Sequence, residues 1–259
     1  MLLDHKVIVI SGAGPGMGQA LARVAAREGA KVVLGARSAD FIEAVASEIR
    51  AEGGAALAVP VDIGDADQCR ALAVAATDAF GTVDGLVNTA YIHGAWTTVD
   101  QADPEDWAKV FDVNCLGALR MTQAVLPAMQ AAGGGAVINV ATMSQVSPFP
   151  GEGGYASTKG ALTTMTRHMA QDFGRWNIRV NAARMGWIGG KPVHDWIDRA
   201  VAGGADRDAL VAGITARIPL GVIPPEEECA KSVLFFVSDY AKMVTGATLD
   251  VNGGQYMAP

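Results

Sequence analysis

The sequence predicts one α/β domain in which a doubly wound, mostly parallel β-sheet carries helices on both faces. Six short apolar runs, rich in β-branched residues, alternate with longer stretches of helical periodicity along the 259 residues. The apolar runs are nearly continuous, which is typical of strands buried on both faces of a parallel sheet. A series of strand–helix–strand units of this length implies right-handed crossovers.

The predicted strands are spread along most of the chain. They are KVIVIS at 6–11, AKVVLGA at 30–36, AALAVPV at 55–61, VDGLVN at 83–88, GAVINVA at 135–141 and IRVNAA at 178–183. The first helix should directly follow the first strand, because apolar residues recur at i, i+4, i+7 and i+8 from Met17. Gly29 is the expected terminator of that helix.

Residues 184–225 interrupt this alternation. They are rich in glycine and proline, contain Trp187 and Trp196, and show only short helical patches. Long connections at the carboxyl ends of strands are where such folds place substrate lids. No linker divides the chain, so we expect a single domain over 1–259 with a mobile lid insertion at about 184–225.

The composition excludes several classes of protein. A net charge of −7 argues against a nucleic-acid binder, which usually shows a basic face. No stretch approaches the roughly 18 to 20 apolar residues of a membrane helix, and the N-terminus lacks the pattern of a signal peptide. We therefore expect a cytoplasmic protein without nucleic-acid or membrane partners.

The three cysteines are expected to be buried, reduced thiols. Cys69, Cys115 and Cys229 are far apart, with no CxxC spacing and no neighbouring histidine. This distribution favours neither a disulfide nor a metal site, and no metal is predicted.

A glycine-rich segment, SGAGPGMG, follows the first strand directly. Gly12 permits a tight turn, Gly16 a close approach of the backbone to phosphate, and Gly18 close packing of helix on strand. The helix that begins here offers free N–H groups and its positive dipole end to a pyrophosphate. The segment, with Pro15 and Met17, therefore predicts a dinucleotide-binding loop.

The residue after the second strand indicates which dinucleotide is preferred. An acidic side chain there would accept hydrogen bonds from the adenosine ribose 2′-hydroxyl, but this chain has Arg37. Arginine pairs with a 2′-phosphate, which favours NADP, with NAD still possible. Pro15 stands where a second basic residue would have strengthened the case, and Asp40 is interpreted as a helix cap.

Tyr155 and Lys159 are four positions apart, so on a helix both side chains face the same way. An unperturbed tyrosine has a pKa of roughly 10, too high for a good base near neutrality. A neighbouring ammonium and a bound nicotinamide cation would favour the phenolate and lower that pKa. Tyr155 can then accept the proton of an alcohol as hydride leaves its carbon, or donate one to a carbonyl in reverse.

These motifs together resemble the short-chain dehydrogenase/reductase family over residues 4–256. The glycine spacing, Asp62, NTA at 88–90, Asn114, Tyr155-x-x-x-Lys159 and the terminal GATLDVNGG occur in the family's order. The resemblance implies a Rossmann fold and an NAD(P)-dependent oxidoreductase. It implies that Asn114 supports a water chain to Lys159, and that Lys159 also holds the nicotinamide ribose. It further implies cofactor contacts at Asp62, Ile63, Asn88, Ala90, Gly186 and Ile188.

The chain departs from the family pattern at two places. NTAY replaces the frequent NNAG and puts Tyr91 beside the expected nicotinamide end. After the sixth strand, residues 184–190 contain neither the usual proline nor the threonine that helps hold the cofactor amide. Backbone groups near Ile188 remain available for that contact, but the affinity for cofactor and the ordering of the lid are put in doubt.

Two hydroxyl side chains precede Tyr155, and either one is a candidate for the substrate-binding hydroxyl. The family often has a serine thirteen residues before the tyrosine, and this position holds Thr142. Ser144 would need a spacing of eleven and is expected in the pocket wall. If the strand continued, the two side chains would point to the same side, about 6 to 7 Å apart. We expect Thr142 to be the catalytic hydroxyl, with Ser144 as the alternative.

The expected substrate wall comes from residues 91–96, from 145–149, and from Trp187 and Trp196. It is aromatic and apolar, and Arg184 and Lys191 are the nearest basic side chains, with a surface role expected for Lys191. We therefore expect a mostly apolar secondary alcohol or ketone, cyclic or aromatic in type.

Two other functions stay open. A 3-oxoacyl-thioester reductase of fatty-acid-type metabolism would be favoured by a basic surface at the mouth of the site, which the acidic composition does not support. A regulator that senses NADP without turnover would be expected to lack Tyr155 and Lys159. By resemblance, helices around 106–131 and 156–175 would form a homotetramer or homodimer.

Overall fold

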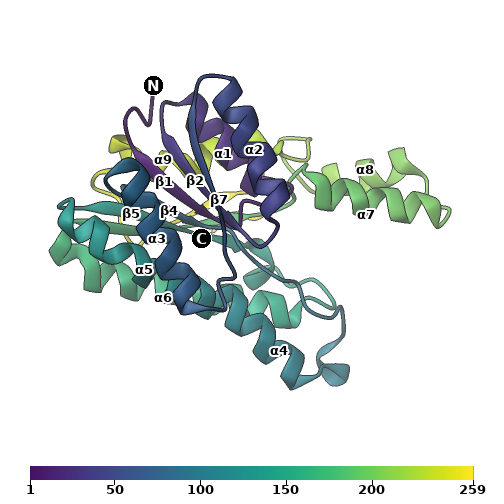
Figure 1. Cartoon of the computed structure of the whole chain (residues 1–259). Coiled ribbons are helices and arrows are strands. Elements are labelled where there is room, and N and C mark those ends of the chain that lie inside the picture. The colour runs from purple at the N-terminus through teal and green to yellow at the C-terminus, as the bar shows by residue number, and fades with distance from the viewer. Residues whose placement is uncertain (259) are drawn as a thin grey trace.

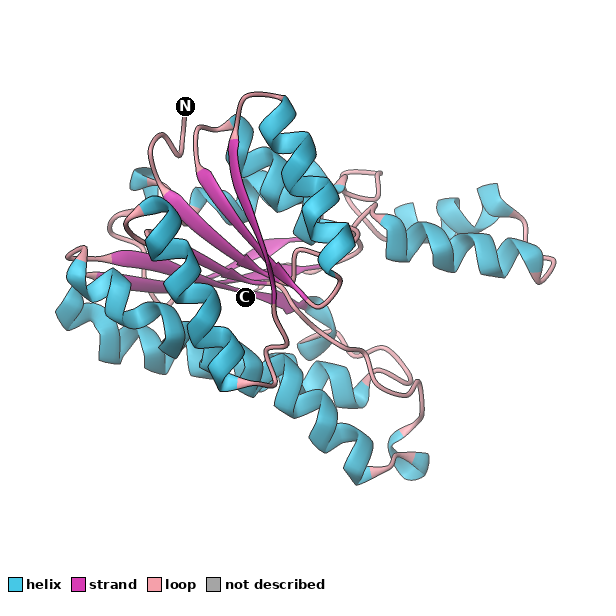
Figure 2. Cartoon of the chain, in the orientation of Figure 1, coloured by secondary structure: helices cyan, strands magenta, loops and turns pink. Residues whose placement is uncertain are grey.

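A computed structural model describes residues 1–258, and within them seven strands form one fully parallel sheet. The spatial order is β3-β2-β1-β4-β5-β6-β7, and Figure 2 shows the strands fanning through the centre of the domain. The strands are β1 (Val7–Ser11), β2 (Lys31–Ala36), β3 (Ala55–Pro60), β4 (Gly85–Asn88), β5 (Gly135–Thr142), β6 (Ile178–Met185) and β7 (Thr248–Val251). The predicted fold class, a doubly wound α/β domain, is confirmed.

Helices cover both faces of the sheet (Figure 1). They are α1 (Met17–Arg27), α2 (Ala39–Ala51), α3 (Ala66–Phe80), α4 (Pro104–Phe111), α5 (Ala118–Ala131), α6 (Gly153–Phe173), α7 (Lys191–Ala202), α8 (Arg207–Thr215) and α9 (Glu226–Phe235). The helices α1, α2 and α9 pack into one apolar core, whereas α3, α5 and α6 pack into a second core across the sheet. This sandwich explains why the predicted strands read as continuous apolar runs.

The six predicted strands agree with the structure within two residues at each end. The seventh strand, β7, was not predicted as a strand. It is four residues long, pairs only with β6 along the sheet edge, and is partly exposed, so it lacks the apolar signal of a central strand.

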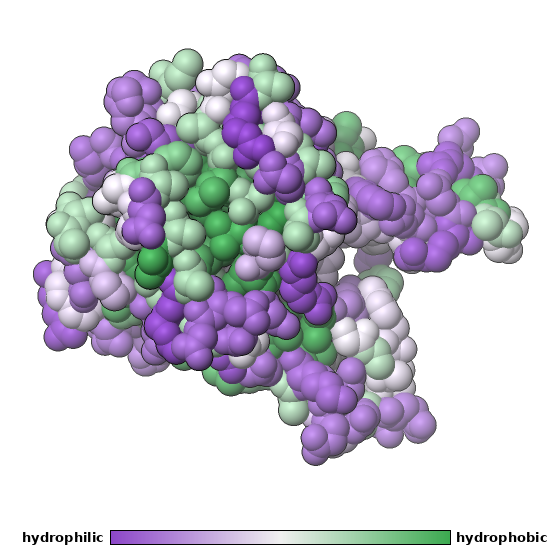
Figure 3. Space-filling view, in the orientation of Figure 1, coloured by the Kyte–Doolittle hydropathy of each residue, from purple (hydrophilic) through white to green (hydrophobic). Residues whose placement is uncertain are grey.

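The prediction of only short helical patches over 184–225 is wrong. This segment contains α7, which is twelve residues long, and α8, which Asp206 caps by accepting a hydrogen bond from the Ala209 N–H at 2.8 Å. The two helices project from the body of the domain as an arm (Figure 1), and Figure 3 shows that the visible face of this arm is mostly hydrophilic.

The expected long helix around 106–131 is interrupted. A π-helical segment, η2 (Asp112–Gly117), joins α4 to α5 without breaking the helical path. Such segments insert one extra residue per turn and often occur at functional sites. Asn114 lies within it, so its side chain is placed differently from that of an ordinary helical residue.

Two expectations from composition can be compared with the structure. Cys69, Cys115 and Cys229 are buried free thiols, as predicted. Among residues 1–258, none of the helices combines the length and hydropathy needed to cross a lipid bilayer.

Candidate active site

Most of the predicted site residues lie at the carboxyl ends of the parallel strands, where open α/β sheets form their ligand crevice. Gly12, Arg37 and Gly186 follow β1, β2 and β6, while Asn88 and Thr142 are the last residues of β4 and β5. Strand order reverses between β1 and β4, so the ends of these two strands mark the centre of the crevice.

The glycine-rich loop at this crevice is packed too closely for side chains. Gly12 has φ +96°, and a Cβ there would lie 2.3 Å from the backbone N of Ala90. A Cβ on Gly18 would lie 2.1 Å from the carbonyl oxygen of Gly12. Gly16 has φ +96° and begins α1 without any side-chain cap, so Met17 and Gly18 start the helix with free N–H groups. With Pro15 in the turn, this cradle fits a pyrophosphate.

The adenosine end of the crevice carries one basic and one acidic side chain. Arg37 is exposed directly after β2. Asp62 is exposed after β3 and accepts a hydrogen bond from the Gly64 N–H at 2.9 Å, while the adjacent Ile63 is buried beneath Gly117. The interpretation of Asp40 as a cap is wrong, because Ser38 occupies the N-cap of α2 and Asp40 lies in its first turn.

The side chain of Asn88 points into the protein. Its Nδ2 donates to Asn139 Oδ1 at 3.0 Å and to Thr122 Oγ1 at 3.3 Å, and Asn139 in turn donates to Thr166 Oγ1 at 2.8 Å. This buried polar chain ties β4 to β5, α5 and α6.

Tyr155 and Lys159 lie on one face of α6, as predicted from their spacing. The Nζ of Lys159 is 6.0 Å from the centre of the Tyr155 ring and 5.9 Å from that of Tyr91. Lys159 is 1% exposed and donates to the carbonyl oxygen of Val140 at 2.8 Å. Burial lowers the pKa of Lys159 to about 8.

The pKa of Tyr155 is raised in the free protein, although the sequence predicts that Lys159 lowers it. Burial is the largest cause, the charges of Tyr91 and Glu152 add to it, and the Thr142 hydroxyl opposes it. The predicted lowering of the Tyr155 pKa also depends on the positive charge of a bound nicotinamide. The protein alone does not supply that charge.

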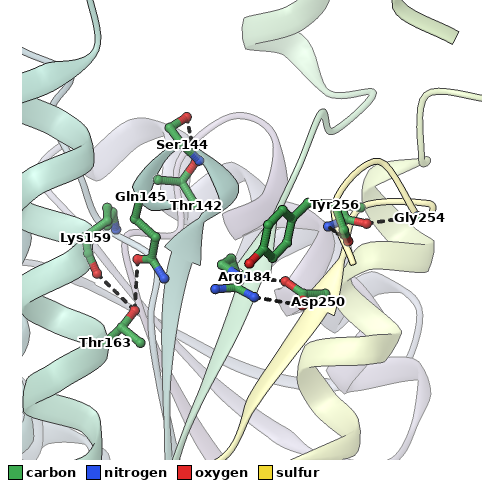
Figure 4. Close-up of polar contacts among 10 residues, drawn as sticks. Thr142, Ser144, Gln145, Lys159, Thr163, Arg184, Asp250, Gly254 and Tyr256 are labelled. Carbon is green, nitrogen blue, oxygen red and sulfur yellow. Dashed lines mark hydrogen bonds and ion pairs between the residues drawn. The ribbon is translucent and has the colours of Figure 1, made fainter. Parts of the chain in front are cut away.

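The chain does not continue as a strand beyond Thr142. Residues Met143–Gln145 form a 3₁₀ turn, and Thr142 accepts from the Ser144 N–H at 3.3 Å. The two hydroxyl oxygens are therefore 3.2 Å apart and hydrogen-bonded, much closer than the spacing along an extended strand. Gln145 accepts from Thr163, which itself donates to the Lys159 carbonyl (Figure 4). The turn thus joins both candidate hydroxyls to the helix that carries Lys159.

Asn114 anchors the loop after β4. Its Oδ1 accepts from the Ile92 N–H at 2.8 Å, and its Nδ2 donates to the Ile92 carbonyl at 2.9 Å and to Thr158 Oγ1 at 3.1 Å. The Thr158 hydroxyl donates to the carbonyl of Tyr155 at 2.7 Å. Asn114 therefore connects the loop to the helical turn between Tyr155 and Lys159.

Aromatic side chains surround Tyr155. The Tyr91 ring lies 5.7 Å from the Tyr155 ring, and the His93 ring lies 4.9 Å from it at 23°. Trp96 stacks on the other face of His93 at 3.9 Å. Glu152 lies 3.6 Å from His93. From the sequence, residues 91–96 were expected only to line the substrate pocket. The contact between His93 and Glu152 was not predicted, because no local motif links these two residues.

Arg184, one of the two basic side chains nearest the expected substrate wall, is paired within the protein and is not available to hold a substrate. Its guanidinium forms two hydrogen bonds with Asp250, at 2.5 and 2.8 Å, and packs 4.8 Å from the Tyr256 ring (Figure 4). Lys191 pairs with Asp195 on the surface of α7, as its expected surface role implies.

The segment after β6 combines buried and partly exposed residues. Gly186 donates its N–H to the Val251 carbonyl at 3.2 Å, and Ile188 packs partly buried against the core. Trp187 lies 5.5 Å from Trp196 of α7, ring centre to ring centre. The arm is thus joined to the end of β6 by an aromatic contact.

Comparison with known proteins agrees with this geometry. A family profile described as Enoyl-(Acyl carrier protein) reductase matches residues 12–255. The chain is 33% identical over 262 residues to trans-4-hydroxycyclohexanecarboxylate dehydrogenase of Sinomonas cyclohexanicum, covering 97% of this chain and 93% of that protein. It is 32% identical over 253 residues to 3-oxoacyl-(acyl-carrier-protein) reductase of Staphylococcus aureus, covering 97% and 98%. A short-chain type dehydrogenase/reductase of Mycobacterium ulcerans superposes with a TM-score of 0.89 at 26% identity, covering 98% and 91%.

Proposed function

The chain belongs to the short-chain dehydrogenase/reductase family of NAD(P)-dependent oxidoreductases, and from that premise we propose that it interconverts a mostly apolar secondary alcohol and its ketone. The observation that carries the proposal is the arrangement of Tyr155, Lys159 and Thr142 at the carboxyl end of β5. We further propose NADP as the preferred cofactor, with NAD as the alternative.

The glycine cradle and the start of α1 would hold the pyrophosphate of the cofactor, and Arg37 would face a 2′-phosphate. The bound nicotinamide supplies the chemistry of hydride acceptance and donation. Asp62 and Ile63 would line the adenine side, the backbone of residues 88–90 the floor, and Gly186 and Ile188 the carboxamide end.

Tyr155 serves as the general acid/base. Its phenolate accepts the hydroxyl proton of the alcohol while hydride leaves the carbon, and its phenol returns that proton in ketone reduction. Lys159, whose ammonium is near the ring, favours the phenolate and holds the nicotinamide ribose. Thr142 hydrogen-bonds the substrate oxygen, and Ser144, bonded to Thr142, orients that hydroxyl.

The substrate side of the site supports an apolar, cyclic type of substrate. Tyr91, Trp96 and Phe149 are among the exposed large apolar side chains. The relative from Sinomonas cyclohexanicum is named for trans-4-hydroxycyclohexanecarboxylate, whose ring supports the cyclic type but which also carries a carboxylate. Trp187 and the arm of α7 and α8 would cover the bound substrate as a lid.

A spectrophotometric panel tests this proposal. Cyclohexanol, cyclohexanone, 1-phenylethanol and acetophenone are assayed at the reduced-nicotinamide band with both cofactors. Tyr155→Phe should abolish turnover and retain cofactor binding, whereas the control Tyr240→Phe, at a residue 81% exposed, should behave as wild type. Full activity of Tyr155→Phe would refute the mechanism.

A 3-oxoacyl-thioester reductase is the second candidate, and the Staphylococcus aureus relative favours it. Acetoacetyl-coenzyme A added to the panel decides between the two, because that candidate requires turnover of a thioester in preference to the cyclic ketones. Cofactor binding without turnover of any ketone would instead indicate an NADP-sensing protein.

A homotetramer or homodimer is proposed for the assembly. Phe111 and Leu116 on the α4–α5 path and Phe235 on α9 are exposed apolar side chains suited to such contacts. Light scattering during size-exclusion chromatography measures the mass, and a monomer at micromolar concentration would exclude this assembly.

A further inference from the structure

We propose that His93 and Glu152 form a positioning pair for Tyr155, which holds the phenol ring in place and sets the charge beside it. The inference rests on the proposed role of Tyr155 as the general acid/base. Neither residue belongs to the motif that carries the family resemblance.

The His93 ring is held between two aromatic rings. On one side it stacks on Trp96, with ring centres 3.9 Å apart and planes 2° apart. On the other side it lies against Tyr155, with ring centres 4.9 Å apart and planes at 23°. Stacked rings at these distances attract one another, so the imidazole restricts how far the phenol can tilt.

Glu152 fixes the imidazole from the side. Its Oε1 lies 3.6 Å from His93 Nε2, and the two side chains are only 15% and 22% exposed. Burial raises the pKa of Glu152, but the neighbouring His93 and Ser144 side chains outweigh burial and hold that pKa below its usual value. The carboxylate is therefore ionised near neutral pH and places its negative charge beside the imidazole. The neighbouring Ser144 hydroxyl accepts a hydrogen bond from Thr142 at 3.2 Å.

The backbone around His93 is anchored on both sides. Asn114 binds both the N–H and the carbonyl of Ile92, and Asp106 accepts from the Ala95 N–H at 2.9 Å. Between them Gly94 has φ +73°, and a Cβ there would lie 2.5 Å from Val110. A residue held between two such anchors is suited to positioning its neighbour.

The pair also acts on the charge that Tyr155 experiences. The titratable side chains facing the phenol are Tyr91 and His93 from the loop after β4, Glu152 at the N-cap of α6, and Lys159 within α6. Asp106 of α4 faces the far end of the loop, and Cys115 faces Lys159. The negative charge of Glu152 opposes the phenolate, and the His93 ring lies beside that carboxylate.

The pH profile of alcohol oxidation tests the pair. We would measure kcat/KM from pH 6 to 10 with cyclohexanol or 1-phenylethanol, whichever wild type oxidises faster. Glu152→Gln removes the opposing charge and should move the rising limb to lower pH by about one unit. His93→Phe keeps an aromatic ring in the stack but removes the polar imidazole edge that stabilises the Glu152 carboxylate, so the limb should move to higher pH. The double variant should follow Glu152→Gln.

Opposite shifts of the two single variants support the pair, and any other pattern overturns it. If the two residues had a purely structural role, their variants would lower kcat without shifting the pH profile. The control Glu105→Gln, at an exposed residue of α4, should keep the wild-type profile. Tyr155→Phe separates the two proposals: if it is inactive while the profiles do not shift, only the pair fails, and if it is active, the proposed function fails.

Discussion

Lys159 donates a hydrogen bond from Nζ to the carbonyl oxygen of Val140 at 2.8 Å, at a position where only 1% of the residue is exposed. An ammonium in such a place is poorly solvated, and its pKa falls to about 8. The hydrogen bond fixes the charge beneath the Tyr155 and Tyr91 rings, where the proposed chemistry needs it. Function and stability therefore make opposite demands on this residue.

Lys159→Met should be inactive but more stable than wild type at pH 7, by about 2 kcal/mol. The pKa in the folded state is below the ordinary value of 10.5. Burying the charged form therefore destabilises wild type fully below pH 8, and this penalty is lost as pH rises from 8 to 10.5. Urea unfolding at pH 7 and pH 10 measures the effect. A stability difference that does not change with pH would contradict it.

Thr142→Val should lower kcat by about a hundredfold, because it removes the hydroxyl and keeps the branched shape. Thr142→Ser should stay within a fewfold of wild type, since serine has the same donor and acceptor. Ser144→Ala should cause a smaller loss than Thr142→Val, because Ser144 reaches the substrate through Thr142. A larger loss in Ser144→Ala would assign the substrate contact to Ser144 instead.

Sequence reasoning succeeded where the signal is local. The first six strands, the glycine turn and the same-face placement of Tyr155 and Lys159 follow from periodicity and spacing. The hydrogen bond between the Thr142 and Ser144 hydroxyls could not be predicted in this way. It depends on a change from strand to 3₁₀ turn within three residues, which packing decides. Contacts between distant segments were not foreseen: Arg184 and Asp250 are 66 positions apart, and their pairing becomes visible only when β6 and β7 lie side by side.

Arg37→Ala should weaken binding of NADPH by about tenfold and change NADH binding little. The guanidinium is exposed after β2, where it is positioned to meet a 2′-phosphate but has little to contact on a ribose hydroxyl. Fluorescence titration gives the two dissociation constants directly. Arg70→Ala, at an exposed arginine of α3, serves as the control, and equal weakening of both cofactors in Arg37→Ala would remove the basis for an NADP preference.

Arg184→Met should destabilise the protein by about 3 kcal/mol, because it leaves the Asp250 carboxylate without its partner. The side chains of the pair are 9% and 20% exposed, so solvent compensates little for the lost contact. Arg184→Met combined with Asp250→Leu should recover most of this loss, since no uncompensated charge remains. Lys191→Met at the exposed pair with Asp195 should change stability by no more than about 0.5 kcal/mol. Urea midpoints for the four proteins test these values, and a double variant as unstable as Arg184→Met would show that the arginine acts through its packing on Tyr256.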